Sequence, residues 1–363
     1  MKRTFSLLCL VMTLFLTGCG PSAPPGPKVY TAGSYQDGTI FRACYWEGTV
    51  RHELPGDGVH EAQARDICLA GGEVYTAGYY KNGAVSTPCY WVGTTRHDLE
   101  LGTGAIMGHA SSIFVDGDGT VYTAGQYRSG TGDIVPCYWE GTERHDLSVT
   151  SSEAGAMDIC IAGGVVYIAG YYKGATEDIA CLWVDGVLTS LPLASLFEGE
   201  DAYAFSVFVD GGTVYLSGSH YSNTAHRSIP CYWVKTPETV AMYALSGVAE
   251  TREDAAHAIL VEDGVVYAAG AHYDSGIGQT IPCYWVVTEV GTAEGLERYD
   301  LAYGTGEPYA TAKDISRTGG TIYAAGHYED GSIDQACYWR GTERFDLPGG
   351  TNRSYAEAIF VQH

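Results

Sequence analysis

Three histidines stand at what reads as one repeated position, immediately before the last tyrosine of a recurring segment: His220, His272 and His327. Imidazole nitrogen is a common zinc ligand, held about 2.1 Å from the ion. Equivalent positions of neighbouring repeats diverge outward, so the three imidazoles are expected to lie too far apart to share an ion. We interpret them as residues that pack between repeats, and we predict no metal site and no cofactor.

Three aspartates also recur, each before an apolar residue: Asp66, Asp158 and Asp314. Two carboxyl groups held close together could act as general acid and general base. Their recurrence, in alternation with Ser112 and Ser206, favours a structural role instead. We expect their side-chain oxygens to form hydrogen bonds that join neighbouring repeats.

Other residues with catalytic or ligand chemistry follow the repeat as well. His52, His97 and His145 belong to recurring Arg-His-[Asp/Glu]-Leu segments. The run Asp116–Gly119 lacks the bidentate glutamate of a calcium loop and is typical of a hairpin turn. The sequence has neither a Gly-rich phosphate loop nor a Gly-x-Ser-x-Gly nucleophile motif. No catalytic residue is predicted.

A repeat organises these residues. The motif hydrophobic-Tyr-x-[Ala/Ser]-Gly begins at Val29, Val74, Val121, Val166, Val214, Val266 and Ile322. Successive copies begin between 45 residues (Val29 to Val74) and 56 residues (Val266 to Ile322) apart. This period is typical of the blades of β-propellers.

Each unit contains four short runs rich in β-branched and aromatic residues. In one unit these are 66–69, 74–77, 88–91 and 95–99, separated by the turn signals Gly71-Gly72, Asn82-Gly83 and Gly93-Thr94. No stretch has sustained helical periodicity. We therefore predict an all-β protein built from four-stranded units.

The two ends of the repeat region complement each other. The run Tyr355–Val361 copies the strand that precedes every other Val-Tyr, but no Val-Tyr follows it. The first Val-Tyr, at Val29, lacks that preceding strand. The last strand is therefore predicted to complete the first unit, which closes the ring and removes two sheet edges. The prediction is a seven-bladed β-propeller with four-stranded blades over residues 29–363.

The Tyr-x-Ala-Gly and Cys-Tyr-Trp repeats resemble those of seven-bladed β-propellers of the kelch-like kind. They are also similar to the repeats of bacterial β-propeller lipoproteins. The resemblance covers residues 29–363. It departs from kelch in having one glycine where kelch has two, as at Gly78 and Gly125, and in placing tryptophan in the third strand. Neither group has a single shared activity that the resemblance would imply.

The cysteines of the domain are predicted to be free. Two of them, Cys68 and Cys160, lie in innermost strands, two strands away from the third-strand cysteine of the same unit, which is about 9 to 10 Å. A disulfide needs Cα atoms within roughly 7 Å. We expect core packing from the third-strand cysteines, Cys44, Cys89, Cys137, Cys181, Cys231, Cys283 and Cys337, and from all seven tryptophans, Trp46, Trp91, Trp139, Trp183, Trp233, Trp285 and Trp339.

One position of the innermost strand breaks the repeat. Its residues share no chemistry: Arg65, Ser111, Met157, Phe205, His257, Lys313 and Glu357. We expect this position beside the central channel, just after the loop that joins two blades, where a propeller displays a specific site. These seven residues are our predicted ligand-binding positions. Arg65, His257 and Lys313 would form a positive rim for an anionic group of a sugar or a protein.

The first residues, MKRTFSLLCLVMTLFLTGCG, are typical of an export signal, with a basic start and an apolar run shorter than the about 20 residues that span a bilayer. The ending Leu16–Cys19 resembles the lipobox of bacterial lipoproteins. The resemblance implies removal of residues 1–18, lipid attachment at Cys19, and a membrane as partner. Residues 19–28, rich in Pro and Gly, would tether the domain.

The chain is acidic, with 43 Asp and Glu against 20 Lys and Arg. This charge argues against nucleic acid as a partner. We predict a monomeric, non-catalytic propeller, anchored by lipid in the bacterial cell envelope, at the outer membrane or the cell surface. It would bind a protein or glycan through its channel-mouth face. A glycan hydrolase or lyase with its site at the channel mouth is the alternative, and a purely structural envelope protein is a second.

Overall fold

The computed structural model describes residues 26–193, 200–222, 227–245, 255–292, 294–304, 309–331, 333–350 and 352–363. The expected signal segment, Cys19 and most of the tether lie outside the described residues. The described part contains strands and turns, and no helix long and apolar enough to cross a bilayer was found in it.

The strands run consecutively along the chain. Those of the first half are β1 (Lys28–Asp37), β2 (Ile40–Glu47), β3 (Val50–Glu53), β4 (Ala62–Ala70), β5 (Glu73–Asn82), β6 (Val85–Val92), β7 (Thr95–Asp98), β8 (Met107–Val115), β9 (Val121–Arg128), β10 (Ile134–Glu140), β11 (Glu143–Asp146), β12 (Ala154–Ala162), β13 (Val165–Lys173), β14 (Asp178–Val184) and β15 (Val187–Ser190). Those of the second half are β16 (Ala202–Asp210), β17 (Thr213–Ser222), β18 (Arg227–Lys235), β19 (Val240–Ala244), β20 (Ala255–Glu262), β21 (Val265–Asp274), β22 (Gln279–Val287), β23 (Leu296–Asp300), β24 (Ala310–Thr318), β25 (Thr321–Asp330), β26 (Ile333–Arg340), β27 (Glu343–Asp346) and β28 (Ser354–Gln362).

These strands form antiparallel four-stranded sheets. Sheets β12–β15, β16–β19, β20–β23 and β24–β27 each follow the chain order. Strands β4–β7 and β8–β11 are two more such units, linked into one eight-stranded sheet only by the parallel pairing of Ser86 with Met107. The 28 strands agree with the expected four-stranded units.

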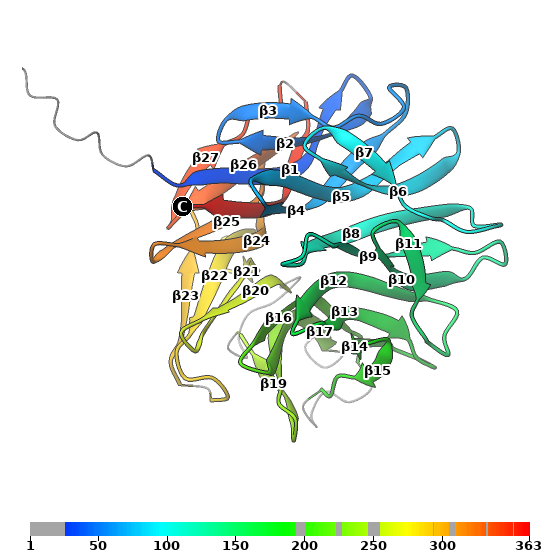
Figure 1. Cartoon of the computed structure of the whole chain (residues 1–363). Helices are drawn as coiled ribbons and strands as arrows, with labels where there is room; N and C mark the ends of the chain where they lie inside the picture. Colours follow the sequence, from blue (N-terminus) through cyan, green and yellow to red (C-terminus); the bar gives the residue numbers. More distant parts are fainter. Residues whose placement is uncertain are drawn as a thin grey trace, which may run out of the picture.

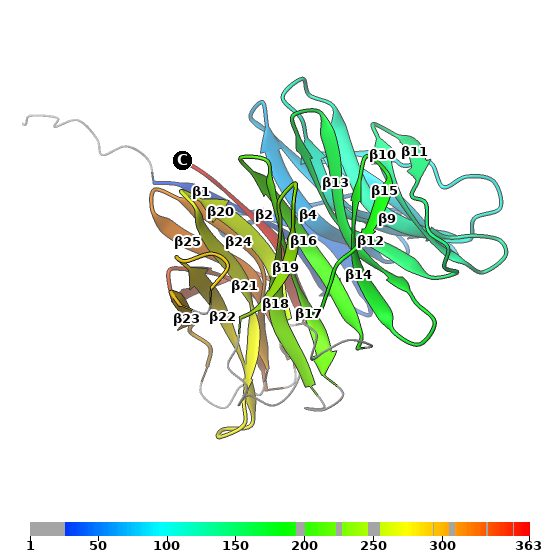
Figure 2. The same cartoon turned by 90° about the horizontal axis from the view of Figure 1, so that it is seen from below.

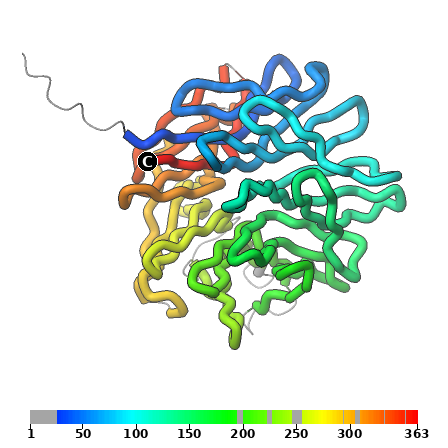
Figure 3. The backbone as a smooth tube through the Cα atoms, in the orientation of Figure 1, coloured from blue at the N-terminus to red at the C-terminus, as the bar shows by residue number. Residues whose placement is uncertain are grey.

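The sheets are arranged radially. Strands β4, β8, β12, β16, β20 and β24 lie nearest the centre of the ring (Figure 1), and the tube in Figure 3 follows the chain around it. Each innermost strand contacts the innermost strands of both neighbouring sheets, β28 with β4 and β24 included. Figure 2 shows the ring from below, with the strands of each sheet crossing its thickness. This closed ring of radial sheets is a β-propeller.

The ring closes as the sequence predicts. Strand β28 pairs with β1, with Val361 opposite Val29 and Ala358 opposite Ala32, and the sheet order is β28-β1-β2-β3. The first blade is thus built from both ends of the domain. Neither β1, the first strand, nor β28, the last, is therefore left without a partner strand.

Every innermost strand carries one extra residue. The register between β4 and β5 skips Arg65, because Ala64 lies opposite Gly78 and Asp66 opposite Ala77. Such a β-bulge kinks the strand and re-aims a side chain. The residues skipped in this way, hereafter the bulge residues, are Arg65, Ser111, Met157, Phe205, His257, Lys313 and Glu357. They are the seven positions at which the sequence breaks its repeat.

The bulge explains the glycine of the Tyr-x-Ala-Gly motif. A Cβ atom on Gly78 would lie 2.0 Å from the carbonyl oxygen of Gln63, because the kinked β4 backbone passes directly over that glycine. A real Cβ cannot approach an oxygen so closely, so only glycine fits. The same approach, at 1.9 to 2.0 Å, occurs at Gly33, Gly125, Gly170, Gly218, Gly270 and Gly326.

The tryptophans join neighbouring blades, as their predicted core position requires. All seven are at most 1% exposed. The indole N–H of Trp91 donates to the carbonyl of Pro55, which lies just after the outer strand of the preceding blade, at 3.1 Å. The equivalent bonds run from Trp46 to Pro348, Trp139 to Glu100, Trp183 to Ser148, Trp233 to Pro192 and Trp339 to Ala302.

The Arg-His-Asp-Leu segments are structural too. In the blade β4–β7, the ring of His97 stacks on Tyr90, with ring centroids 4.8 Å apart. The Arg96 guanidinium lies 3.8 Å from the ring centroid of Tyr80, whose hydroxyl donates to Asp98 at 3.0 Å. His52 and His145 stack in the same way, on Tyr45 and Tyr138. These polar residues therefore hold the outer strand against the blade.

The cysteines are free, as expected. The third-strand cysteines are fully buried, and Cys68 and Cys160 are half-buried. Burial raises the thiol pKa of both Cys89 and Cys68. The nucleophile is the ionised thiolate, and a raised pKa keeps these cysteines in the neutral thiol form. These residues therefore act as small apolar side chains that fill the core rather than as reactive groups.

Deleting residues 354–363 tests the closure of the ring. The deletion exposes an edge of β1 and removes the buried Ile359 and Val361, which contribute about 1.5 to 3 kcal/mol each. We expect a large loss of unfolding free energy, or aggregation, in a urea titration. Removal of the exposed Gln362 and His363 alone is the control and should change little. Equal stability of the long deletion and the intact chain would contradict the closure.

Candidate binding site at the channel mouth

The bulge residues surround the ring axis on one face. They sit in the first half of the innermost strands, close to the loops that enter from the preceding blade; we call this side of the ring the mouth face. Arg65 is exposed and the other six bulge residues are half-buried, so water reaches all seven. The same backbone position in every blade thus presents a different side chain at one level around the axis.

An aromatic wall covers one arc of the mouth face. The ring of Phe205 lies nearly parallel to that of Tyr203, at an interplanar angle of 3° and a centroid distance of 6.2 Å. On one side Tyr171 meets Tyr203 edge-on at 5.1 Å, and on the other Phe205 contacts His257 at 5.6 Å. The rings come from β13, β16 and β20, three successive blades. Together they form a continuous, partly exposed apolar surface.

Aromatic groups also line the remaining arc. Tyr79 stacks on His109 with a centroid distance of 4.3 Å, and the Arg65 guanidinium lies 5.6 Å from the centroid of Tyr79. Across the ring closure, His327 meets Tyr355 edge-on at 4.9 Å. Sequence reasoning missed the aromatic residues at the starts of the innermost strands, because they recur in only some blades.

Acidic groups at this face are neutralised locally. The Glu61 carboxylate accepts hydrogen bonds from the Tyr79 hydroxyl at 2.8 Å and from the Lys81 ammonium at 2.7 Å. Both donors lower its pKa against the opposing effect of burial. Two similar groups pair Tyr203 and Lys173 with Asp178, and Tyr355 and Arg353 with Asp334. The rim is therefore less negative than its composition suggests.

Two cations remain without an ionic partner. Neither Arg65 nor Lys313 has a carboxylate oxygen within 4 Å among the described residues. Burial lowers the pKa of Lys313, and the positive charge of Arg65 adds to this effect while Glu357 opposes it. A half-buried cation in that situation gains energy when an anion approaches.

His257, the third residue expected to carry a positive charge, does not carry one. Burial, together with Lys313 and His327, lowers the pKa of His257 well below its usual value. His257 is therefore neutral at physiological pH, and the prediction of a three-residue positive rim is wrong in this respect. The positive part of the mouth face consists of Arg65 and Lys313.

The three histidines do not share one position. His327 directly follows the motif glycine, Gly326, and lies opposite Ala336. His220 and His272 come one residue later, after Ser219 and Ala271, which take the position of His327 in their blades. A shift of one residue turns a side chain to the other face of the sheet. The expectation of one shared position is therefore wrong, whereas the expected packing between blades holds for His327, which contacts Tyr355 of the adjoining blade.

His220 and His272 occupy the place that tyrosine has in most blades. His272 contacts Asp300 at 3.1 Å, replacing the usual tyrosine–aspartate bond. His220 is fully buried, and its Nδ1 lies 3.5 Å from Oε2 of the buried Glu200, while burial lowers the pKa of the imidazole. This pair stands beside a cavity of about 180 Å³ that Glu200, Asp178 and Leu193 help to line. Glu200, the acidic partner of His220, lies in a loop between two blades, so the repeat pattern of the sequence did not predict this contact.

The aspartates of the innermost strands join blades, as predicted. Asp66 accepts the N–H of Ile113 in the next blade at 2.7 Å, and Asp158 accepts that of Val207 at 2.8 Å. Asp314 completes the ring closure by accepting the N–H of Ile359 at 2.7 Å. Among the residues described, no group of three or more His, Cys, Asp or Glu is arranged to hold a metal ion.

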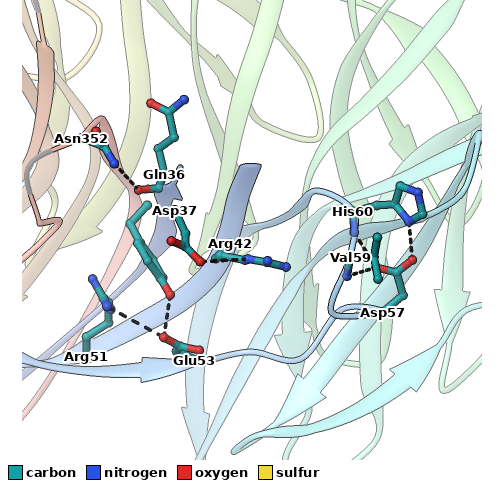
Figure 4. A network of polar contacts seen from close by, with 10 residues as sticks. Gln36, Asp37, Arg42, Arg51, Glu53, Asp57, Val59, His60 and Asn352 are labelled. Atoms are coloured by element: carbon teal, nitrogen blue, oxygen red, sulfur yellow. Dashed lines mark hydrogen bonds and ion pairs between the residues drawn. The ribbon is translucent and has the colours of Figure 1, made fainter. Parts of the chain in front are cut away.

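A second hollow lies at the outer rim between the blades β28–β3 and β4–β7. It has a volume of about 560 Å³. Its polar groups contact one another: Tyr35 donates to Glu53 at 2.5 Å, and Arg42 pairs with Asp37 at 3.8 Å. Figure 4 shows Arg42 beside Asp37 and, in the adjoining loop, Asp57 against His60. Because these groups use their partners internally, the mouth face is the better candidate site.

No family model and no curated protein sequence matches this chain. Solved structures share its fold. A puromycin-hydrolysing peptidase from Mycobacterium tuberculosis has a TM-score of 0.55 at 12% identity, over 87% of this chain and 53% of that chain, so this chain spans about half of the peptidase. An ulvan lyase, from a new polysaccharide lyase family, has a TM-score of 0.50 at 10% identity, over 82% and 81%. The β-propeller domain of the trilobed protease from Pyrococcus furiosus has a TM-score of 0.48 at 11% identity, over 85% and 86%.

The electrostatics of the mouth face can be tested by replacing Lys313. Burial is the main reason that the pKa of His327 is lowered to about 4, and Lys313 lowers it further. Lys313→Met should therefore raise the pKa of His327, measured by NMR titration of the imidazole. Lys235→Met, in a third strand, should leave it unchanged. An unaltered His327 titration in Lys313→Met would contradict the described proximity.

Proposed function

We propose that this chain is a lipid-anchored, seven-bladed β-propeller of the bacterial cell envelope that binds a glycan through its mouth face. The observation that carries the proposal is the set of bulge residues. They share one backbone position, yet they are the residues at which the repeat has no common chemistry. A structural position would be kept alike in every blade, as the tryptophans are.

The chemistry of the mouth face suits a sugar. Phe205, Tyr203 and His257 offer flat apolar faces beside polar groups, and ligand sites combine an apolar lining with a few directed polar contacts. Arg65 and Lys313 add positive charge for a carboxylate or sulfate on the glycan. A protein partner with an acidic side chain would satisfy the charge but would make less use of the aromatic wall.

The seven blades and the anchor complete the proposal. Twenty-eight strands in four-stranded units support a blade count of seven, and the Tyr-x-Ala-Gly repeats support the likeness to kelch-like propellers. The lipobox-like Leu16–Cys19 supports lipid attachment at Cys19. Acyl chains contribute about 0.8 kcal/mol per buried CH₂, which would hold the domain at a membrane. The described chain starts beside its own C-terminal strand (Figure 1), so the tether would leave the ring at one point of its edge.

A second candidate function is a lyase that acts on a uronate-containing glycan. His109 favours it, because burial and the charges of Arg65 and Lys81 lower its pKa to about 4 and leave a neutral base. In such a reaction the imidazole would take the proton α to the carboxylate, a C=C bond would form, the glycosidic C–O bond would break, and the departing oxygen would take a proton from water. Arg65 would hold the carboxylate. The ultraviolet absorbance of the unsaturated product would reveal this activity.

Binding to a panel of immobilised neutral and acidic polysaccharides tests the proposal. We expect the full chain to bind at least one acidic polysaccharide. Phe205→Ala and Arg65→Ser should each weaken that binding by about tenfold or more, or about 1.4 kcal/mol, because they remove a half-buried ring and an exposed cation without an ionic partner.

The matched control is Phe208→Ala, in the same strand and also half-buried, but three residues further from the mouth face. It should leave binding intact at a comparable cost in melting temperature. Unchanged binding by both mouth variants would remove the site. Absence of binding to every polysaccharide would contradict the glycan proposal and favour a structural role.

A further inference from the structure

The inner ring contains one hydroxyl between two carboxyl groups. Ser112 Oγ lies 2.8 Å from Asp66 Oδ2 and 2.6 Å from Asp158 Oδ1. The three residues come from β8, β4 and β12, the innermost strands of three successive blades. Both distances fall within the range of O–H···O hydrogen bonds.

The number of hydrogens does not match two ionised carboxylates. A serine hydroxyl carries one hydrogen and donates once, whereas an ionised carboxylate only accepts. Two short contacts to Ser112 Oγ need two hydrogens, and the second must come from a protonated carboxyl. We infer that Asp66 and Asp158 hold one proton between them through Ser112, as a proton-binding bridge across three blades.

The two carboxyl groups also accept hydrogen bonds from backbone N–H groups, and these bonds do not replace the shared proton. Ile67 and Ile113 donate their backbone N–H groups to Asp66, and Ile159 and Val207 donate theirs to Asp158. Every carboxyl oxygen of the bridge therefore has a backbone donor of its own. The proton belongs to the bridge as a unit rather than to one aspartate.

The charges that face the bridge favour protonation. Burial raises the pKa of Asp66 to about 7, and the neighbouring Asp158 adds to the effect. Burial also raises the pKa of Asp158. Asp314, on β24, interacts with both carboxyl groups, and burial raises its own pKa to about 8. The thiols of Cys68, near Asp66, and Cys160, near Asp158, stay neutral because burial raises their pKa.

The bridge is placed to act on the mouth face. Asp66, Ser112 and Asp158 directly follow the bulge residues Arg65, Ser111 and Met157. When the proton leaves, two negative carboxylates face one hydroxyl that can satisfy only one of them, and the two blades that carry Asp66 and Asp158 repel at their inner ends. Mildly alkaline pH should therefore loosen the side of the ring that carries Arg65. This inference does not depend on the identity of any ligand.

The sign of the pH effect follows from the raised pKa. A carboxyl whose pKa rises from 3.8 to about 7 on folding stabilises the fold at low pH, and this contribution is lost as pH rises through about 7. The buried histidines act at lower pH, because they are neutral in both states above their ordinary pKa. The buried thiols act only near and above pH 9, where cysteines of the unfolded chain ionise, so the window from pH 6.5 to 8 isolates the bridge and Asp314.

Infrared spectra of the full chain test the bridge directly. At pH 6.5 ordinary carboxyl groups are ionised, so a C=O stretch of a protonated carboxyl must come from a buried one. We expect this band in Asp314→Asn, where the bridge remains, and expect it to vanish in the double variant Asp66→Asn/Asp314→Asn. Asp118→Asn, in an exposed hairpin, should leave the wild-type band unchanged.

The pH dependence of the melting temperature gives a second readout. In Asp314→Asn it should fall between pH 6.5 and 8, and adding Asp66→Asn should remove most of this fall, since the asparagine amide donates to Ser112 without a titratable proton. Absence of the protonated band in Asp314→Asn would overturn the inference. An unchanged pH dependence after Asp66→Asn would do the same.

Discussion

The extra residue in each innermost strand is the constraint on which the rest of the structure depends. It bends the strand so that a backbone carbonyl passes over the second strand, which leaves room only for glycine at positions such as Gly78 and Gly326. It also leaves the bulge residue without a partner in the ladder of the innermost strand. The residue that follows is then aimed at the next blade, where Asp66, Asp158 and Asp314 accept backbone N–H groups. The motif glycine, the hydrogen bonds that close the ring and the candidate site therefore all depend on the same backbone feature, the β-bulge of the innermost strand.

The contacts between blades divide the sequence into structural and variable residues. Buried indole N–H groups bind the exit loop of the preceding blade, and arginine, histidine and tyrosine rings hold the short outer strands. These contacts use most of the aromatic and basic residues that could otherwise suggest a binding surface. What remains without a repeated role is the mouth face, with Phe205, Arg65 and Lys313. The proposed ligand is inferred from those residues alone.

Much of this could be predicted from the sequence, because period, strand pattern and the complementary ends are properties of the chain itself. The closure by β28, the core tryptophans and the free cysteines follow from that pattern. The histidine alignment failed because it counted back from the last tyrosine of the strand, and Tyr221 and Tyr273 lie one residue further from the motif glycine than Tyr328 does. The charge of His257 and the Asp66–Ser112–Asp158 bridge could not be foreseen, since both arise from distances between different blades.

The coupling between bulge and glycine is the most direct test of this account. It can be measured at the ring closure, where Gly33 faces the carbonyl oxygen of Tyr355 and the bulge residue is Glu357. In the intact chain Gly33→Ala should lower the unfolding free energy by about 1 to 3 kcal/mol. After deletion of Glu357, which straightens β28, the same substitution should cost less than about 0.5 kcal/mol, measured by urea unfolding as a double-mutant cycle. An equal cost of Gly33→Ala in both backgrounds would contradict the account.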